Sequence, residues 1–382
     1  YDGRSRLTKA ERYDTDGTSL LHRYSYTYDD ADNMLTKAVY DAGADSTTST
    51  VFAYGDANLL TSQSVGGTTT SFAYDDWGRM TSKSDGTYSA TYAYRYGDKL
   101  YSITSDFPSE GNATYQYDGA GKRRQRTAGG TTTQYRWDLG WTVVNEEDAL
   151  GDLTRTYVGR STAHVDGTNP STGTWRFYVH DHLGSTRAAY NSDKTQYAAL
   201  EHDPYGEVYA SSGSVSDITR RYTGHDWDDA AELYYAPYRY YAPGLARWIS
   251  RDPLGMVDGP NVYAYVGGMP ANNVDLSGGF IIIDLIEWFW NRYQCTKARN
   301  KYEKCRKNNC PPEACPVSDP EYIDDILDKS DPRKTPHPKT TNPKNISLWE
   351  CIQQKCGKEL KNYINKCTGI EDLPNLPTPS NL

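Results

Sequence analysis

This 382-residue sequence holds little phenylalanine. It has no cysteine outside one segment and no long apolar run. There are 6 Phe against 34 Tyr, and all 7 Cys lie at or after Cys295. No apolar run reaches the roughly 18 residues of a membrane span, so a transmembrane helix is excluded. The chain opens at Tyr1 with no basic and apolar leader, and we expect it to be a fragment of a longer protein.

Tyrosine and charge both divide the chain near residue 280. Before this point the sequence holds 25 Lys and Arg against 36 Asp and Glu, a net charge of −11, and from there on 16 against 14, a net of +2. An acidic body argues against a nucleic-acid-binding surface, and the second part is too weakly basic to argue for one. Tyr-rich segments favour β surfaces in which the ring is buried and the hydroxyl stays hydrated.

The first part of the chain is periodic. The segment Tyr28–Thr36 resembles Tyr74–Thr81, and the step from Tyr54 to Tyr74 to Tyr94 is 20 residues each time. Short alternating runs separated by Gly, Asp or Asn predict β-hairpins, and a hairpin cannot bury its apolar face alone. We therefore expect an extended, curved antiparallel sheet with rows of Tyr along one face; a generic β-propeller or sandwich is the alternative.

Six motifs follow in a fixed order after about Phe177. They are Tyr178–Arg187, Asp203–Glu207, Arg221–His225, Glu232–Tyr235 with Arg239–Trp248, Arg251–Gly255, and Asn261–Val266. With the upstream repeats, the chain resembles the RHS/YD-repeat family over residues 1 to about 279, and specifically its RHS-associated core region. This resemblance implies a hollow β shell, in which a strip of hairpins spirals round a cavity and the core region closes one end as a plug.

The resemblance also implies a division into three parts. Residues 1–160 would be a segment of the YD-repeat shell, 161–279 the core or plug, and 280–382 the variable C-terminal region, which is a toxin held inside the shell in many bacterial members. The visible chain is too short to close such a shell. An upstream RHS shell or a companion shell subunit is therefore the expected partner, together with an immunity protein for the C-terminal region.

Family members that release their C-terminal cargo are thought to use the Asp of two Asp-Pro-x-Gly motifs as an aspartic protease. Here the corresponding residues are Asp252, preceded by Arg251, and Asp275, 23 residues later. Two carboxylates that share one proton can activate water and polarise a peptide carbonyl. The cut implied by the resemblance falls between Gly279 and Phe280.

The second motif departs from the family pattern at two positions. Leu276 stands where the family has Pro, and Gly279 stands where it has Leu. Losing the Leu removes a side chain that would anchor the scissile strand, and losing the Pro frees the backbone. The alternative interpretation is that both motifs only form turns, as Asp-Pro and Ser-Gly-Gly often do.

Other candidate sites are weaker. His180 and His182 are two residues apart on an expected strand and could ligate a metal, although the motif looks architectural. No phosphate-binding loop, nucleophile elbow or zinc-protease motif is present, so no cofactor and no metal are expected.

Residues 280–382 are predicted to form an α-helical hairpin tied by disulfides. The gaps between Cys mirror each other in the two expected helices, which favours the pairs Cys295–Cys367 and Cys305–Cys356. Cys310 and Cys315 compete for Cys351, which leaves one odd thiol, and we favour Cys310. A zinc site is a poor alternative because the segment holds only one His and no Cys-x-x-Cys.

Two functions from different classes fit these observations. The first is a toxin-type RHS protein, a shell with a variable effector and candidate self-cleavage. The second is a non-enzymatic surface or adhesion scaffold with a Cys-rich recognition tail. Disulfides belong to oxidising compartments, so both hypotheses predict a secreted or cell-surface protein.

Overall fold

The structure is a computed structural model that describes residues 1–279 except 139–141, 160–161 and 258. The chain divides into two units after Ile283, and every described residue belongs to the first unit. The predicted helical hairpin and all of its cysteines, like Phe280, lie outside the described residues.

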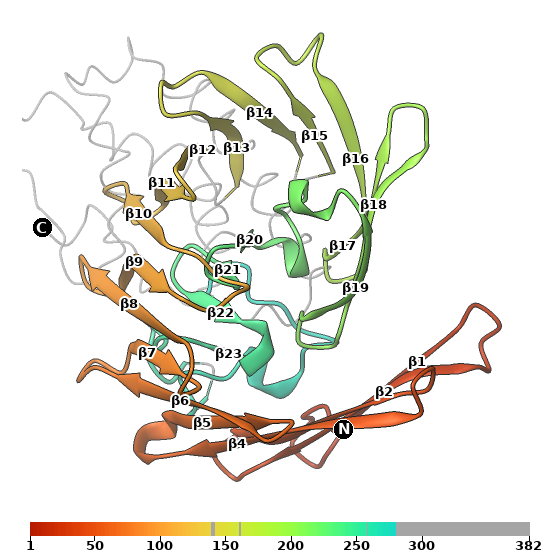
Figure 1. Ribbon diagram of the computed structural model, residues 1–382, viewed down its shortest axis with the longest axis vertical. Helices are drawn as coiled ribbons and strands as arrows, with labels where there is room; N and C mark the ends of the chain where they lie inside the picture. Colours follow the sequence, from red (N-terminus) through yellow and green to blue (C-terminus); the bar gives the residue numbers. More distant parts are fainter. Residues whose placement is uncertain (139–141, 160–161, 258, 280–382) are drawn as a thin grey trace, which may run out of the picture. The chain divides into compact units, whose positions relative to one another are not determined.

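Nineteen strands form one large antiparallel sheet, in which each strand pairs with the next along the chain (Figure 1). They are β1 Lys9–Tyr13, β2 Leu20–Tyr28, β3 Met34–Asp41, β4 Ser46–Tyr54, β5 Leu60–Val65, β6 Thr68–Tyr74, β7 Met80–Ser84, β8 Ser89–Arg95, β9 Lys99–Ser105, β10 Ala113–Tyr117, β11 Arg123–Ala128, β12 Thr131–Trp137, β13 Val143–Glu147, β14 Leu153–Val158, β15 Ala163–Asp166, β16 Thr174–His180, β17 Thr186–Asn191, β18 Gln196–His202 and β19 Val208–Gly213.

A second, four-stranded sheet follows. It consists of β20 Asp226–Asp228, β21 Leu233–Tyr235, β22 Tyr240–Ala242 and β23 Arg247–Trp248. The helical elements of the described residues are the 3₁₀ turns η1 Asp56–Asn58, η2 Val215–Asp217, η3 Tyr222–Gly224, η4 Pro243–Leu245 and η5 Val266–Gly268. Within this part of the chain no helix is long and apolar enough to cross a membrane.

The predicted antiparallel sheet of hairpins is confirmed. The 20-residue step from Tyr54 to Tyr74 to Tyr94 corresponds to the successive strand pairs β4–β5, β6–β7 and β8–β9. A propeller or sandwich would distribute these strands over separate sheets. The continuity of the large sheet therefore excludes the alternative fold.

Each repeat bends at the same point, where a register shift precedes a Tyr. This holds for Tyr28, Tyr54, Tyr74, Tyr94 and Tyr117. In the repeat after Tyr74, Asp75 Oδ1 accepts the backbone N–H of Trp77 at 3.1 Å and of Arg79 at 3.0 Å. The Tyr-Asp motif is thus a β-bulge followed by a turn that the Asp carboxylate holds together.

The Tyr hydroxyls join one repeat to the one before it. Tyr54 donates to Met34 O at 2.8 Å, Tyr94 to Met80 O at 2.9 Å, and Tyr117 to Leu100 O at 2.8 Å. Phe could pack in the same place but could not donate these hydrogen bonds. This ladder gives a physical reason for the scarcity of Phe in the repeats.

The same combination of a register shift and an Asp turn continues at positions where another residue replaces the Tyr. Register shifts followed by an Asp turn occur at Trp137–Asp138, His180–Asp181 and His202–Asp203. The large sheet therefore runs past residue 160, where a boundary was expected, as far as Gly213.

The four-stranded sheet and the loops after it, residues 226–279, pack against the large sheet and are called the plug here. In Figure 1 the strands of the large sheet lie around β20–β23. Tyr234, Tyr241 and Trp248 of the plug share one buried cluster with Tyr24 and Tyr26 of β2. A second buried cluster joins plug strands β21 and β22 to strands β7–β10 of the large sheet. Stacked and edge-on rings make the plug one rigid core with the sheet.

Candidate functional site

Asp252 and Asp275 meet at one arginine of the plug. The Oδ2 atoms of Asp252 and Asp275 lie 2.6 Å and 3.3 Å from the same guanidinium nitrogen of Arg239. The three side chains are 7%, 2% and 3% exposed, in that order. The structure therefore brings the two predicted carboxylates together, with a positive charge between them.

Arg239 is held from several sides. Its guanidinium donates to Val262 O at 3.1 Å and to Gly278 O, and it lies 4.4 Å from the centre of the Trp248 ring. Arg239 begins one of the ordered motifs, but its place beside the two carboxylates was not predicted. The available signal was a single Arg between Tyr238 and Tyr240, in a segment otherwise expected to be buried.

Both carboxylates also hold turns with their second oxygen. Asp252 Oδ1 accepts the Leu254 N–H at 2.8 Å, and Asp275 Oδ1 accepts those of Gly278 at 2.8 Å and Gly279 at 3.1 Å. The turn-forming role considered from the sequence is thus present in the hydrogen bonds. It does not oppose a chemical role, because each Asp still presents Oδ2 to the pair.

The positive charge of Arg239 opposes the use of the two carboxylates as a catalytic dyad. An adjacent guanidinium stabilises carboxylates in their ionised form, whereas an aspartic dyad needs one of its members protonated. Asp252, Asp275 and Arg239 therefore form an ion pair network. Acid–base chemistry would require one carboxylate to leave Arg239.

Arg251, which precedes Asp252 in the sequence, lies against another part of the molecule. It is exposed and lies against Gly78, in the turn between β6 and β7. A Cβ on Gly78 would come within 2.7 Å of Arg251 Cδ, and Tyr263 donates its hydroxyl to Gly78 O at 2.7 Å. Arg251 therefore lies beside the turn between β6 and β7, and Arg239 takes the place beside the carboxylates.

Gly279, the residue before the predicted cut, is buried beside Tyr238. A Cβ at this position would lie 3.1 Å from Tyr238 Cδ2, so the family's Leu would have little room. The departure from the family pattern at this position thus has a steric counterpart in the plug.

His225 lies next to the same cluster. Burial lowers its pKa to about 4, although contact with the Asp275 backbone and the charge of Asp226 oppose the shift. Its Nδ1 lies 2.8 Å from Thr223 Oγ1. A neutral imidazole therefore adjoins the carboxylate pair at neutral pH.

The two histidines considered for metal binding make structural contacts. His182 Nε2 lies 2.9 Å from Ala271 O, and His180 Nδ1 lies 3.4 Å from Thr186 Oγ1. Among the residues that the structure describes, no group of three or more His, Cys, Asp or Glu is arranged to hold a metal ion.

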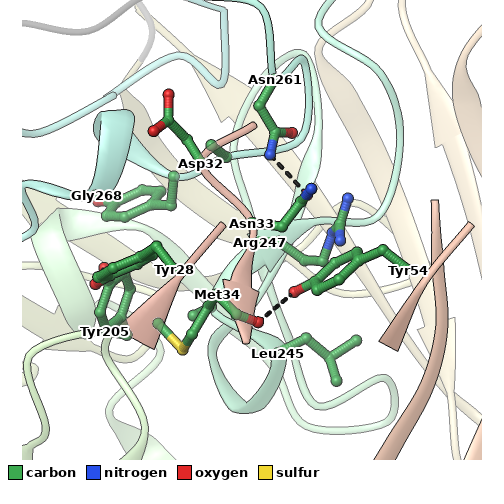
Figure 2. Close-up of a pocket in the computed structure, with 13 residues that line it drawn as sticks. Tyr28, Asp32, Asn33, Met34, Tyr54, Tyr205, Leu245, Arg247, Asn261 and Gly268 are labelled. Atoms are coloured by element: carbon green, nitrogen blue, oxygen red, sulfur yellow. Dashed lines mark hydrogen bonds between the residues drawn. The ribbon is translucent and has the colours of Figure 1, made fainter. Parts of the chain in front are cut away.

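Among the cavities that adjoin the plug, two lie next to residues of the core motifs. One encloses about 20 Å³, room for a single water molecule, and its wall is fixed by the Asn261–Asn33 and Tyr54–Met34 hydrogen bonds (Figure 2). The other has a volume of about 590 Å³ and lies between the inner face of β2–β8 and the plug. Lys37, Asp203 and Glu207 line this larger cavity.

Comparison with known proteins finds similarity in parts of the chain. A family model described as RHS Repeat matches residues 54–90. The tRNA nuclease WapA of Bacillus subtilis (strain 168) is 31% identical over 191 residues, which are 48% of this chain and 8% of that protein. Toxin subunit YenC2 of Yersinia entomophaga is 42% identical over 82 residues, 20% of this chain and 8% of that protein.

Among solved structures, the crystal structure of TcdB2-TccC3-Cdc42 aligns with a TM-score of 0.37 and 16% identity, over 71% of this chain and 19% of that one. The chain thus spans less than a tenth of the two curated relatives named above. Residues 54–90 thus match an RHS repeat, and the chain is similar to RHS-type toxin proteins over the stretches given above.

Proposed function

We propose that this chain is the C-terminal part of a toxin-type RHS protein. In this proposal the described residues belong to a β shell, residues 280–382 are a variable effector, and the shell releases the effector by cutting after Gly279. The names of WapA, a tRNA nuclease, and of YenC2, a toxin subunit, support the toxin class. The meeting of Asp252 and Asp275 at Arg239 is the observation that carries the cleavage step.

The cleavage step needs a carboxylate, a carboxylic acid and a water molecule. The carboxylate would deprotonate the water, which adds to the carbonyl carbon of Gly279, and the acid would protonate the departing nitrogen of Phe280. The Gly279 N–H already lies 3.1 Å from Asp275 Oδ1. Release of one carboxylate from Arg239 would activate the pair, because the freed group could then take up a proton.

A partner would complete the shell at its first strand. Within the described residues β1 pairs only with β2, so its other edge offers backbone N–H and C=O groups to a further strand. An upstream part of the same protein, or a companion shell subunit, would supply that strand. An immunity protein for the effector and export to the cell surface or medium complete the proposal.

The cleavage step is tested by Asp252→Asn and Asp275→Asn in the full chain, followed on denaturing gels with N-terminal sequencing. Wild type should yield a fragment that begins at Phe280, and each variant should stay intact. Asp118→Asn is the matched control, because Asp118 holds the same kind of turn in a repeat through Ala120 and Lys122. A wild-type chain that persists as one species of 42.9 kDa would refute self-cleavage.

A further inference from the structure

Lys37 on β3 meets two carboxylates of the turn between β18 and β19. Its Nζ lies 2.6 Å from Asp203 Oδ2 and 2.6 Å from Glu207 Oε2. The side chains of Lys37 and Asp203 are 7% and 3% exposed, whereas that of Glu207 is 51% exposed. Two segments 166 residues apart thus place an amine, a buried carboxyl and a second, half-exposed carboxyl in contact.

The second oxygen of Asp203 is held by backbone donors. Asp203 Oδ1 accepts the N–H of Tyr205 at 2.8 Å and that of Glu207 at 3.0 Å. If a nucleophile adds to Asp203 Cγ, negative charge develops on this oxygen, and two fixed N–H groups are the arrangement that stabilises it. Lys37 Nζ approaches from the side of Oδ2, the oxygen that would leave.

We propose that Lys37 and Asp203 join in an intramolecular amide bond, with Glu207 as the proton carrier. Nζ of the neutral amine adds to Asp203 Cγ, and Glu207 takes a proton from the nitrogen and returns it to Oδ2. The Nζ–Cγ bond forms, the Cγ–Oδ2 bond breaks, and Oδ2 leaves as water. The ammonium and carboxylate of the starting pair together contain all the atoms of the amide and the water, so no oxidant or other reactant is needed.

The environment of the site favours the reactive form of Asp203 but not that of Lys37. Burial raises the pKa of Asp203, which favours the acid whose hydroxyl can leave. Burial lowers the pKa of Lys37, but the charges of Asp203 and Glu207 outweigh it and raise the pKa above its ordinary value. The reactive amine is therefore the minor form, and the reaction depends on contact geometry, which can supply effective concentrations of about 10⁵–10⁸ M.

The position of the site allows the product water to leave. Lys37, Asp203 and Glu207 line the cavity of about 590 Å³ beside the plug. The bond would tie β3 to the β18–β19 turn, where the first strands of the large sheet contact its last ones. Arg12 of β1 also pairs there with Glu201 of β18, at 2.5 Å.

The test is the intact mass of the full chain after reduction of disulfides, read on whichever species contains residues 1–279. Wild type should be lighter than its sequence by one water, and a protease digest should contain a branched peptide that joins Lys37 to Asp203. Asp203 cannot lose this water as a cyclic imide with the next residue, because Pro204 has no N–H. Asp203→Asn should form the same bond with loss of ammonia.

Three variants separate the amide from a simple ion pair. Lys37→Arg keeps the charge and should restore the full mass, and Glu207→Gln, at a half-exposed position, should do the same by removing the proton carrier. Lys83→Arg is the matched control, since Lys83 forms a partly buried lysine–carboxylate pair with Glu110, and it should keep the deficit. A wild type of full mass, or a deficit that persists in Lys37→Arg, would overturn the proposal.

Discussion

The Lys37 and Arg239 clusters are built on the same kind of turn, in which an Asp carboxylate accepts backbone N–H groups. They differ in the cation that faces the turn. Asp203 and Asp275 each use Oδ1 to accept backbone N–H groups and present Oδ2 to a buried positive side chain. Lysine can lose its proton and become a nucleophile, whereas the guanidinium of arginine stays charged. The turn is thus a reusable positioning device, and the residue that faces it decides which chemistry is open.

Access to solvent separates the two clusters further. Glu207 is half-exposed beside a cavity, while Asp252, Asp275 and Arg239 are all nearly buried. Expulsion of water suits the first cluster, because the product has somewhere to go. Hydrolysis at the second cluster needs water to enter, so the proposed cleavage must begin with a local opening around Arg239.

The largest expected effect comes from removing the cation of the second cluster. Arg239→Ala removes the positive charge that faces two buried carboxylates, and we expect the free energy of unfolding to fall by about 3–5 kcal/mol. Chemical denaturation of the full chain measures this. Arg251→Ala is the control and should change stability by only about 0.5 kcal/mol, since Arg251 is exposed. Equal effects would mean that Arg239 is not the centre of the cluster.

A smaller effect should come from the buried histidine beside each cluster. Burial lowers the pKa of His202, next to Asp203, to about 3 and that of His225 to about 4, against an ordinary value of 6.5. Below pH 6.5 the unfolded chain binds more protons than the folded one, so stability falls as pH drops. Between pH 7 and pH 5 each histidine should account for a loss of about 2 kcal/mol.

Denaturant titrations at these pH values test the prediction on single variants. His202→Gln and His225→Gln should each remove their share of the pH dependence. His182→Gln, at an exposed position, controls for the substitution of a histidine by glutamine. A pH dependence that is the same in all three variants and in wild type would contradict the assignment.

The smallest effect concerns a repeat whose turn carries neither cluster. Tyr94→Phe removes the hydrogen bond to Met80 O and should cost about 1–2 kcal/mol of stability, because a buried carbonyl loses its donor. Tyr96→Phe is the control, since Tyr96 is 84% exposed, and should have an effect below about 0.5 kcal/mol. If thermal or chemical unfolding shows equal losses of stability for Tyr94→Phe and Tyr96→Phe, the hydrogen bonds of the Tyr hydroxyls do not explain the repeated Tyr.

Much of the fold could be predicted because its determinants are local. The spacing of Tyr54, Tyr74 and Tyr94 reports a hairpin repeat directly, and each Asp turn closes within five residues. The repeat could not be recognised at His180 and His202, because a histidine stands there in place of Tyr. Pattern matching by residue type could not recognise the substitution, although the backbone register shift is the same.

The candidate sites were only half visible for a different reason. Asp252 and Asp275 stand in recognisable motifs, but their partner Arg239 is defined by where the plug folds. Arg251, adjacent in sequence to Asp252, points to Gly78 of the large sheet instead. Neighbours along a turn diverge in space, so adjacency in the sequence did not reveal Arg239.

The hairpin repeat, the Asp turns and the change of composition near residue 280 follow from residues close together in the chain, so they can be inferred without the fold. The cation that faces each turn is set by the tertiary fold. Lys37 reaches Asp203 across 166 residues and Arg239 reaches Asp275 across 36. Such contacts follow from how the large sheet curves back on its first strands and how the plug packs, which no local pattern specifies.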